Sequence, residues 1–125
     1  MTAALTVFLV DDDDSFREST QWLLEAAGVD VIAFSTAKDF LAQIKTQGLP
    51  EHKYCVVTDF RMPEMNGFEL IDEMRRLHLS SPVIMITGHG DVPVAVEAMR
   101  MGAAHFLEKP LDGDVLIETV QRIVD

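Results

Sequence analysis

The sequence has few of the features that mark secreted, membrane-bound or disulfide-linked proteins. Its only cysteine is Cys55, so no disulfide can form within the chain, and a reducing compartment is expected. No apolar run approaches the length of a membrane span, and the first six residues lack the basic segment of a signal peptide. These absences predict a soluble, cytoplasmic protein with no membrane contact.

Basic residues are also scarce. The chain has 10 Lys and Arg against 21 Asp and Glu, for a net charge of −11. This negative field repels phosphate backbones, which argues against direct nucleic-acid binding by this chain. The 125 residues, 48% of them hydrophobic and 25% charged, have the size and composition of one globular domain.

Five apolar, β-branched runs recur at similar intervals and predict β-strands: Leu5–Val10, Val29–Phe34, Tyr54–Thr58, Val83–Thr87 and Ala104–Leu107. Helical periodicity follows each run, near residues 15–27, 36–45, 67–77 and 92–101 and again after Pro110. This alternation predicts an α/β fold, a five-stranded parallel doubly wound sheet in the flavodoxin-like order 2-1-3-4-5, with five helices covering its two faces.

The first helix is expected to begin beside a cluster of aspartates, where Ser15 and Glu18 fit a capping box. Gly28 is expected to end it. Its periodicity predicts a buried face that consists of Phe16, Leu23, Leu24 and Ala27.

Polar residues follow the carboxyl ends of four of the five predicted strands. Residues 11–14, all Asp, follow the first strand and Asp59 follows the third, while Thr87 closes the fourth and Lys109 follows the fifth. Open parallel sheets bind ligands beyond these ends, and strands one and three are neighbours in the predicted order. We therefore expect the aspartate cluster and Asp59 to share one crevice.

Such a crevice favours a cation and a phosphoryl group. Two carboxylates about 5 Å apart repel by roughly 3 kcal/mol at an effective dielectric of about 20. The site must therefore retain a proton or hold a divalent cation, and oxygen ligands with room for water suit Mg²⁺. A cation, Lys109 and the Thr87 hydroxyl facing one carboxylate would bind a phosphoryl group, with Asp59 as the nucleophile.

Each of these residues also has a simpler explanation. Asp13 or Asp14 can cap the first helix, although four consecutive aspartates exceed what capping needs. Thr87 could be an ordinary strand-end hydroxyl, and Lys109 a solvated loop lysine. Their joint occurrence at the ends of neighbouring strands favours a functional site.

Five stretches carry these residues: VFLVDDDD (residues 7–14), VVTDFRMPEMNGFEL (56–70), PVIMITGHGD (82–91), AVEAMRMGA (95–103) and FLEKP (106–110). Over its full length the chain resembles the receiver domain of two-component response regulators. The resemblance implies that Asp59 is the phosphoacceptor. It also implies that Asp11, Asp12, Asp59 and the backbone carbonyl of Arg61 hold Mg²⁺, and it assigns no other cofactor.

The resemblance implies a switch as well. Thr87 would bond a phosphoryl oxygen, and Lys109 would pair with the phosphoryl group and precede Pro110 through a cis peptide bond. Phe106 occupies the position of the switch aromatic residue. Phosphorylation would then alter the face of the fourth helix and fifth strand, where a homodimer could form.

The implied function is that of a signalling domain rather than a conventional enzyme. A sensor histidine kinase would phosphorylate Asp59, with the domain catalysing its own phosphoryl transfer and slow autodephosphorylation. Arg61 and His89 would flank the path of the hydrolytic water. Asp14 extends the usual acidic cluster, and its role is open.

The segment TGHGD (residues 87–91) is similar to the corresponding segment in regulators of the nitrogen-fixation (FixJ-like) and dicarboxylate-transport types. In those regulators either a helix-turn-helix module or an ATPase module follows the receiver, which implies a DNA-binding output domain that controls transcription. Residues 1–125 would then be the receiver domain of a longer regulator whose output domain is absent from this chain. A stand-alone receiver is the alternative.

Three other functions fit parts of the pattern. Asp11 and Asp13 form the D-x-D text of a haloacid-dehalogenase-like phosphatase, but the second acidic pair of that fold is missing. A flavodoxin-like FMN binder shares the topology, but four aspartates after the first strand would repel phosphate. A receiver-like module that never takes phosphate would not need Asp59, Thr87 and Lys109.

Overall fold

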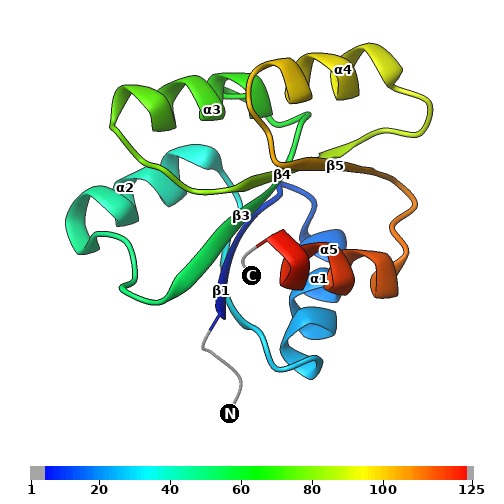
Figure 1. The fold of residues 1–125 in the computed structure, drawn as a ribbon, viewed down its shortest axis with the longest axis horizontal. Helices are drawn as coiled ribbons and strands as arrows, with labels where there is room; N and C mark the ends of the chain where they lie inside the picture. Colours follow the sequence, from blue (N-terminus) through cyan, green and yellow to red (C-terminus); the bar gives the residue numbers. More distant parts are fainter. Residues whose placement is uncertain (1–4, 124–125) are drawn as a thin grey trace.

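The structure, a computed structural model that describes residues 5–123, is a parallel sheet with helices on both faces (Figure 1). The strands are β1 (Leu5–Val10), β2 (Asp30–Phe34), β3 (Lys53–Asp59), β4 (Val83–Thr87) and β5 (His105–Glu108), in the order β2-β1-β3-β4-β5. The helices are α1 (Asp14–Ala26), α2 (Ala37–Gln47), α3 (Gly67–Arg76), α4 (Val92–Arg100) and α5 (Gly113–Ile123). None of these helices has the length and hydropathy of a membrane span. The predicted fold class and strand order are confirmed.

The beginning of α1 differs from the prediction. Asp13 is the N-cap residue, and its carboxylate accepts a hydrogen bond from the backbone N–H of Phe16 at 3.1 Å. Ser15 lies inside the helix, so the predicted capping box of Ser15 and Glu18 is wrong, because Asp13 already occupies the capping position. Ala27 is the exposed C-cap residue, so its predicted burial is also wrong.

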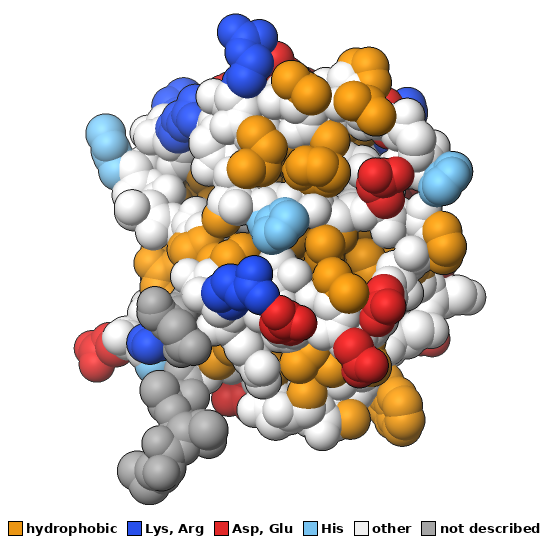
Figure 2. Space-filling model, turned by 45° about the vertical axis from the view of Figure 1, so that its right-hand side comes forward, with side chains coloured by type: hydrophobic (Ala, Val, Ile, Leu, Met, Phe, Trp, Pro, Cys, Tyr) orange, Lys and Arg blue, Asp and Glu red, His pale blue; other side chains and the backbone are white. Residues whose placement is uncertain are grey.

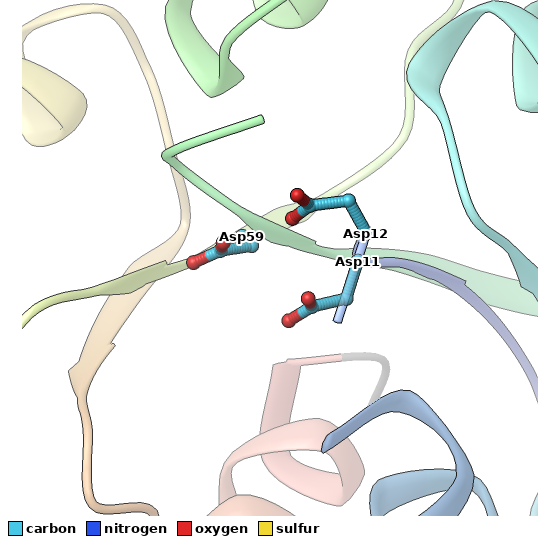
Figure 3. Close-up of side chains that lie close together, drawn as sticks. All are labelled: Asp11, Asp12 and Asp59. Carbon is cyan, nitrogen blue, oxygen red and sulfur yellow. The ribbon is translucent and has the colours of Figure 1, made fainter. Parts of the chain in front are cut away.

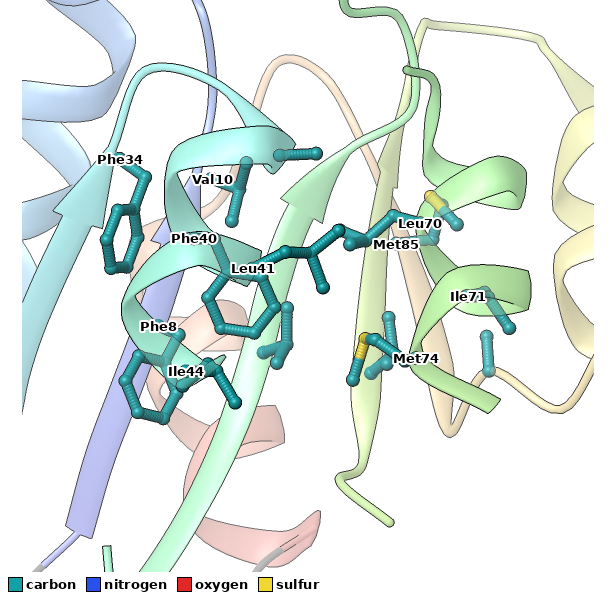
Figure 4. Packing of buried hydrophobic residues seen from close by; sticks show 14 of the residues in the cluster. Phe8, Val10, Phe34, Phe40, Leu41, Ile44, Leu70, Ile71, Met74 and Met85 are labelled. Atoms are coloured by element: carbon teal, nitrogen blue, oxygen red, sulfur yellow. The ribbon is translucent and has the colours of Figure 1, made fainter. Parts of the chain in front are cut away.

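Two hydrophobic clusters hold the helices to the sheet. On one face, α2, α3 and α4 cover a cluster that includes Phe8, Phe40, Leu70 and Met85 (Figure 4). On the other face, α1 and α5 cover a second cluster that includes Leu9, Leu24, Val57 and Leu116. Because β1, β3 and β4 are buried on both faces, their central residues are apolar.

Only part of the apolar stripe of α5 is buried. Leu116 and Val120 are buried in the second cluster, whereas Val115 is 44% exposed. The helical periodicity after Pro110 predicts one apolar stripe that consists of Val115, Leu116, Val120, Ile123 and Val124. Of these residues, Val124 lies outside the described part of the chain.

Candidate functional site

Three aspartates meet where the carboxyl ends of β1 and β3 lie side by side. Val10 is paired with Thr58 in the parallel ladder, so the residues that follow, Asp11 and Asp59, come to the same edge of the sheet. Asp12 completes the group, and one carboxylate oxygen from each aspartate lies within 4.8 Å of the other two. Figure 3 shows the three side chains close together at this edge.

Asp11 is buried, with 1% of its surface exposed. Its Oδ1 accepts a hydrogen bond from the backbone N–H of Asp13 at 2.9 Å. Among the described residues, its Oδ2 has no hydrogen-bond partner. Burial raises the pKa of this carboxyl group above its usual value.

Asp59 is the last residue of β3 and is 8% exposed. Burial, and secondly the negative charge of Asp11, raise the pKa of Asp59 to about 6. Without a bound cation, it is therefore energetically unfavourable for all of these carboxyl groups to be ionised at once.

Lys109 provides a positive charge at this site. Its Nζ lies 3.6 Å from Asp59 Oδ1 and 3.7 Å from Asp11 Oδ2. The backbone N–H of Lys109 donates to the carbonyl of Thr87 at 2.9 Å, which ties the end of β5 to the end of β4. The peptide bond between Lys109 and Pro110 is cis, as expected.

The donor set fits a hard divalent cation. Three carboxylates converge, one of them has a buried oxygen without a hydrogen-bond partner among the described residues, and the single nearby ammonium cannot balance three negative charges. Carboxylate oxygens with room for water are the ligands that Mg²⁺ uses in proteins. A cavity of about 510 Å³ beside Asp12, bordered by Arg61 and Asn66, provides that room.

The two predicted switch residues lie next to this site on β4 and β5. Thr87 is fully buried at the end of β4, and its hydroxyl donates to the carbonyl of Leu107 at 3.4 Å. Phe106 is partly buried and packs against the cluster that α2, α3 and α4 cover. In this structure the Thr87 hydroxyl is therefore engaged by β5.

Arg61 and His89 are both exposed. The Arg61 guanidinium pairs with Asp91, with its Nη2 3.2 Å from a carboxylate oxygen. The His89 side chain is 87% exposed, and its Nδ1 lies 4.0 Å from a carboxylate oxygen of Glu108.

The sequence analysis missed the part that Arg17 plays beside the site. Its guanidinium donates to the backbone carbonyl of Asp11 at 2.8 Å and pairs with Asp14 at 2.6 Å. Asp14, whose side chain is 79% exposed, thus orients Arg17, and the Arg17 guanidinium in turn holds the backbone carbonyl of Asp11. The i,i+3 spacing of Asp14 and Arg17 was the one signal in the sequence.

Known proteins share both the sequence and the fold. Residues 7–121 match the response regulator receiver domain family. The chain is 46% identical over 121 residues to the transcriptional regulatory protein FixJ of Azorhizobium caulinodans, covering 97% of this chain and 56% of that protein. It is 41% identical over 123 residues to the C4-dicarboxylate transport transcriptional regulatory protein DctD of Pseudomonas aeruginosa, covering 98% of this chain and 26% of that protein.

A solved structure agrees with this match. The crystal structure of FixJ-N superposes with a TM-score of 0.87 at 42% identity, covering 98% of this chain and 94% of that one. The chain spans 56% of the length of the FixJ relative and 26% of the DctD relative. From the sequence match, the shared fold and the acidic site at the carboxyl ends of the strands, we conclude that the chain belongs to the family of response regulator receiver domains.

Proposed function

We propose that Asp59 accepts a phosphoryl group from the phosphohistidine of a sensor histidine kinase. The observation that carries this proposal is the position of the Lys109 ammonium, 3.6 Å from Asp59 and 3.7 Å from Asp11. A carboxylate nucleophile beside a positive charge, with further carboxylates to hold a cation, suits phosphoryl transfer, because such transfer depends mainly on positioning and charge neutralisation.

The transfer itself is a simple exchange of bonds. A carboxylate oxygen of Asp59 forms a bond to phosphorus as the bond between phosphorus and the donor imidazole nitrogen breaks. The electron pair of the broken bond returns to that nitrogen. Lys109 balances part of the charge of the phosphoryl oxygens.

Asp11, Asp12, Asp59 and the backbone carbonyl of Arg61 would hold Mg²⁺. The ion would neutralise charge on the phosphoryl oxygens and on the crowded carboxylates. The buried Oδ2 of Asp11, which has no hydrogen-bond partner among the described residues, supports this assignment.

The domain's own residues would supply most of the catalysis. Asp59 and Lys109 are already held together, so a small acyl phosphate could replace the kinase as donor. Water would later hydrolyse the aspartyl phosphate slowly, on a path flanked by Arg61 and His89. The lifetime of the signal would then be a property of the domain.

Phosphorylation would shift the domain between two states. The hydrogen bond of the Thr87 hydroxyl to Leu107 is long, at 3.4 Å, and is easily exchanged for one to a phosphoryl oxygen. Movement of Thr87 would open space into which Phe106 could turn. The new phosphoryl contact is the differential interaction that such a shift requires.

The face of α4, β5 and α5 would transmit this change. Hydrophobic side chains gather on this face (Figure 2), and Val92 is 61%, Val96 54% and Met99 45% exposed on α4. An exposed apolar patch of this kind suits a protein interface. We assign it to a homodimer formed on phosphorylation or to contact with a DNA-binding output domain, in keeping with the transcriptional relatives.

Intact mass spectrometry after incubation with Mg²⁺ and acetyl phosphate tests the proposed acceptor. The wild-type chain should gain about 80 Da, the mass of one phosphoryl group. Asp59→Asn should gain nothing. Asp72→Asn is the matched control, because it makes the same change at an exposed aspartate on α3 outside the acidic cluster, and it should gain the same mass as the wild type.

Two outcomes would contradict this assignment. A gain that persists in Asp59→Asn would place the nucleophile among the other aspartates. A wild-type chain that gains no mass from acetyl phosphate or from a phosphorylated histidine kinase would overturn the proposed function.

A further inference from the structure

The aromatic ring of Phe16 lies against the Lys109 ammonium on the α1 side of the site. Lys109 Nζ is 4.2 Å from the centre of the ring. A cation this close to the face of an aromatic ring is attracted by the negative electrostatic potential that the ring quadrupole places there. Phe16 is therefore in contact with the only ammonium that reaches Asp11 and Asp59 among the described residues.

The Phe16 ring is held by its own helix and by the hydrophobic core, independently of the aspartates. The backbone N–H of Phe16 donates to the capping carboxylate of Asp13, which holds the first turn of α1 in place. The side chain of Phe16 packs against the cluster that α1 and α5 cover. Lys109, by contrast, extends four methylene groups from the end of β5 and remains 30% exposed.

The acidic partners of Lys109 do not fix its position alone. Its distances to Asp59 and Asp11, 3.6 and 3.7 Å, exceed the 2.7–2.9 Å that is typical of a charge-assisted hydrogen bond. Both carboxylates also change their environment when a cation or a phosphoryl group arrives. Of the ammonium's contacts with Asp11, Asp59 and Phe16, only the contact with the ring involves a group whose charge distribution stays the same throughout.

From this geometry we propose that Phe16 is a positioning residue that holds the Lys109 ammonium at the site of phosphoryl transfer by a cation–π contact. This inference rests on the proposed function and deepens it. Phe16 does not touch the reacting atoms. It acts through Lys109, so its substitution should slow the transfer without removing the acceptor.

A purely structural role for Phe16 makes a different prediction. If the ring only fills space beside Leu23 and Leu111, any apolar side chain of similar size would serve equally well, and only the stability of the fold would respond. The electrostatics of the ring separate the two roles, because fluorination weakens the π-system with little change in volume.

The kinetic test follows the rate of mass gain with acetyl phosphate and saturating Mg²⁺. Phe16→Leu should lower this rate by about 2- to 30-fold, the equivalent of a cation–π contact of about 0.5–2 kcal/mol. Phe16→Trp should restore it, since indole is the better cation–π partner and a groove of about 380 Å³ beside Phe16 and Lys109 offers room. Mono-, di- and trifluorinated phenylalanine at residue 16 should give stepwise lower rates.

Leu23→Ala is the matched control. Leu23 packs against the same cluster and lines the same groove, but its side chain is apolar and offers the ammonium no π-system. This variant should unfold at a lower temperature than Phe16→Leu and still accept the phosphoryl group at the wild-type rate.

A second measurement tests the contact without any phosphoryl transfer. The ring current of Phe16 should shift the NMR signals of the Lys109 ε-methylene protons upfield, and Phe16→Leu should abolish this shift. Unshifted signals in the wild type would overturn the inference. So would a Phe16→Leu rate equal to that of the wild type, or equal rates across the fluorinated series, and in these cases the proposed function would stand. A wild-type chain that never gains a phosphoryl group would overturn both.

Discussion

At the scale of single residues, the site is a group of carboxylates in an unfavourable environment. Asp11 and Asp59 are buried and lie close to Asp12, so burial raises the pKa values of both groups and repulsion by neighbouring aspartates raises them further. The single ammonium of Lys109 lowers them only in part. Such sites store unfavourable energy that a bound cation or a phosphoryl group can release.

Replacing Asp59 by Asn should stabilise the metal-free domain near pH 7. The pKa of Asp59 is about 6 in the folded state against a usual value of 3.8, so the folded state binds this proton more tightly than the unfolded state does. The stability that the protonated carboxyl group contributes is therefore fully present below pH 3.8 and is lost as the pH rises through about 6. We expect Asp59→Asn to raise the free energy of unfolding by about 1–3 kcal/mol at neutral pH. Urea denaturation in EDTA at several pH values measures this gain, which should vanish near pH 4.

Magnesium should reverse the ranking. The ion binds the folded wild type and relieves its repulsion, whereas Asp59→Asn has lost one ligand, so saturating Mg²⁺ should stabilise the wild type more. Asp72→Asn, which removes an exposed acid on α3, is the control for net charge and should respond to Mg²⁺ like the wild type. An Asp59→Asn variant that is less stable than the wild type in EDTA at pH 7 would contradict this account of the site.

At the scale of elements, the connection from β3 to α3 is folded against the edge of the sheet that carries the three aspartates. The backbone N–H of Gly67 donates to the carbonyl of Phe60 at 2.9 Å, which folds the connection back onto the end of β3. Asn66 and Glu69 form a capping box at the start of α3. Gly67 is buried, and a Cβ atom there would lie 2.3 Å from the Met85 sulfur and 3.3 Å from the Phe60 Cα.

Gly67→Ala should therefore destabilise the fold. The Met85 side chain is fully buried, so it cannot swing away without disturbing its cluster, and the backbone of Phe60 blocks the other side. We expect a loss of about 1–3 kcal/mol, the usual effect of overpacking a core. Thermal denaturation measures the loss, with Gly88→Ala as the control, since nothing lies within 4 Å of a Cβ at that position. Equal effects of the two substitutions would refute the steric explanation.

At the scale of the whole molecule, charge and hydrophobicity oppose each other. The net charge of −11 makes two copies of the chain repel. The face of α4, β5 and α5 carries an exposed apolar patch that favours association. Whether two copies associate therefore depends on ionic strength, which weakens the charge repulsion, and on the conformation of the α4, β5 and α5 face.

Val96→Glu should prevent self-association of the phosphorylated chain. The substitution places a charge in the middle of the exposed α4 residues, where an interface would have to bury it. Sedimentation with and without acetyl phosphate should show a phosphorylation-dependent dimer for the wild type, strengthened by salt, and a monomer for Val96→Glu. The control is Trp22→Glu, which adds the same charge at a 73% exposed apolar residue on α1, across the sheet. If only Trp22→Glu blocked the dimer, the interface would lie on α1.

The sequence by itself determined the fold. β1 and β4 have the predicted bounds, and α2 lies where helical periodicity was found near residues 36–45, because apolar periodicity directly reflects which side chains leave water. It also identified the residues that gather at the carboxyl edge, since parallel strands bring their carboxyl ends together whatever the details of packing.

Only the tertiary structure decided how these residues are held. The sequence could not choose between Asp13 and Ser15 as the cap of α1, because both residue types cap helices and the two positions differ by only two residues. Nor could it place Arg17 against the Asp11 carbonyl or the Phe16 ring against Lys109. The latter contact joins residues 93 positions apart and depends on the packing of α1 beside the end of β5, because local patterns record which residues are buried but not which residues touch across the fold.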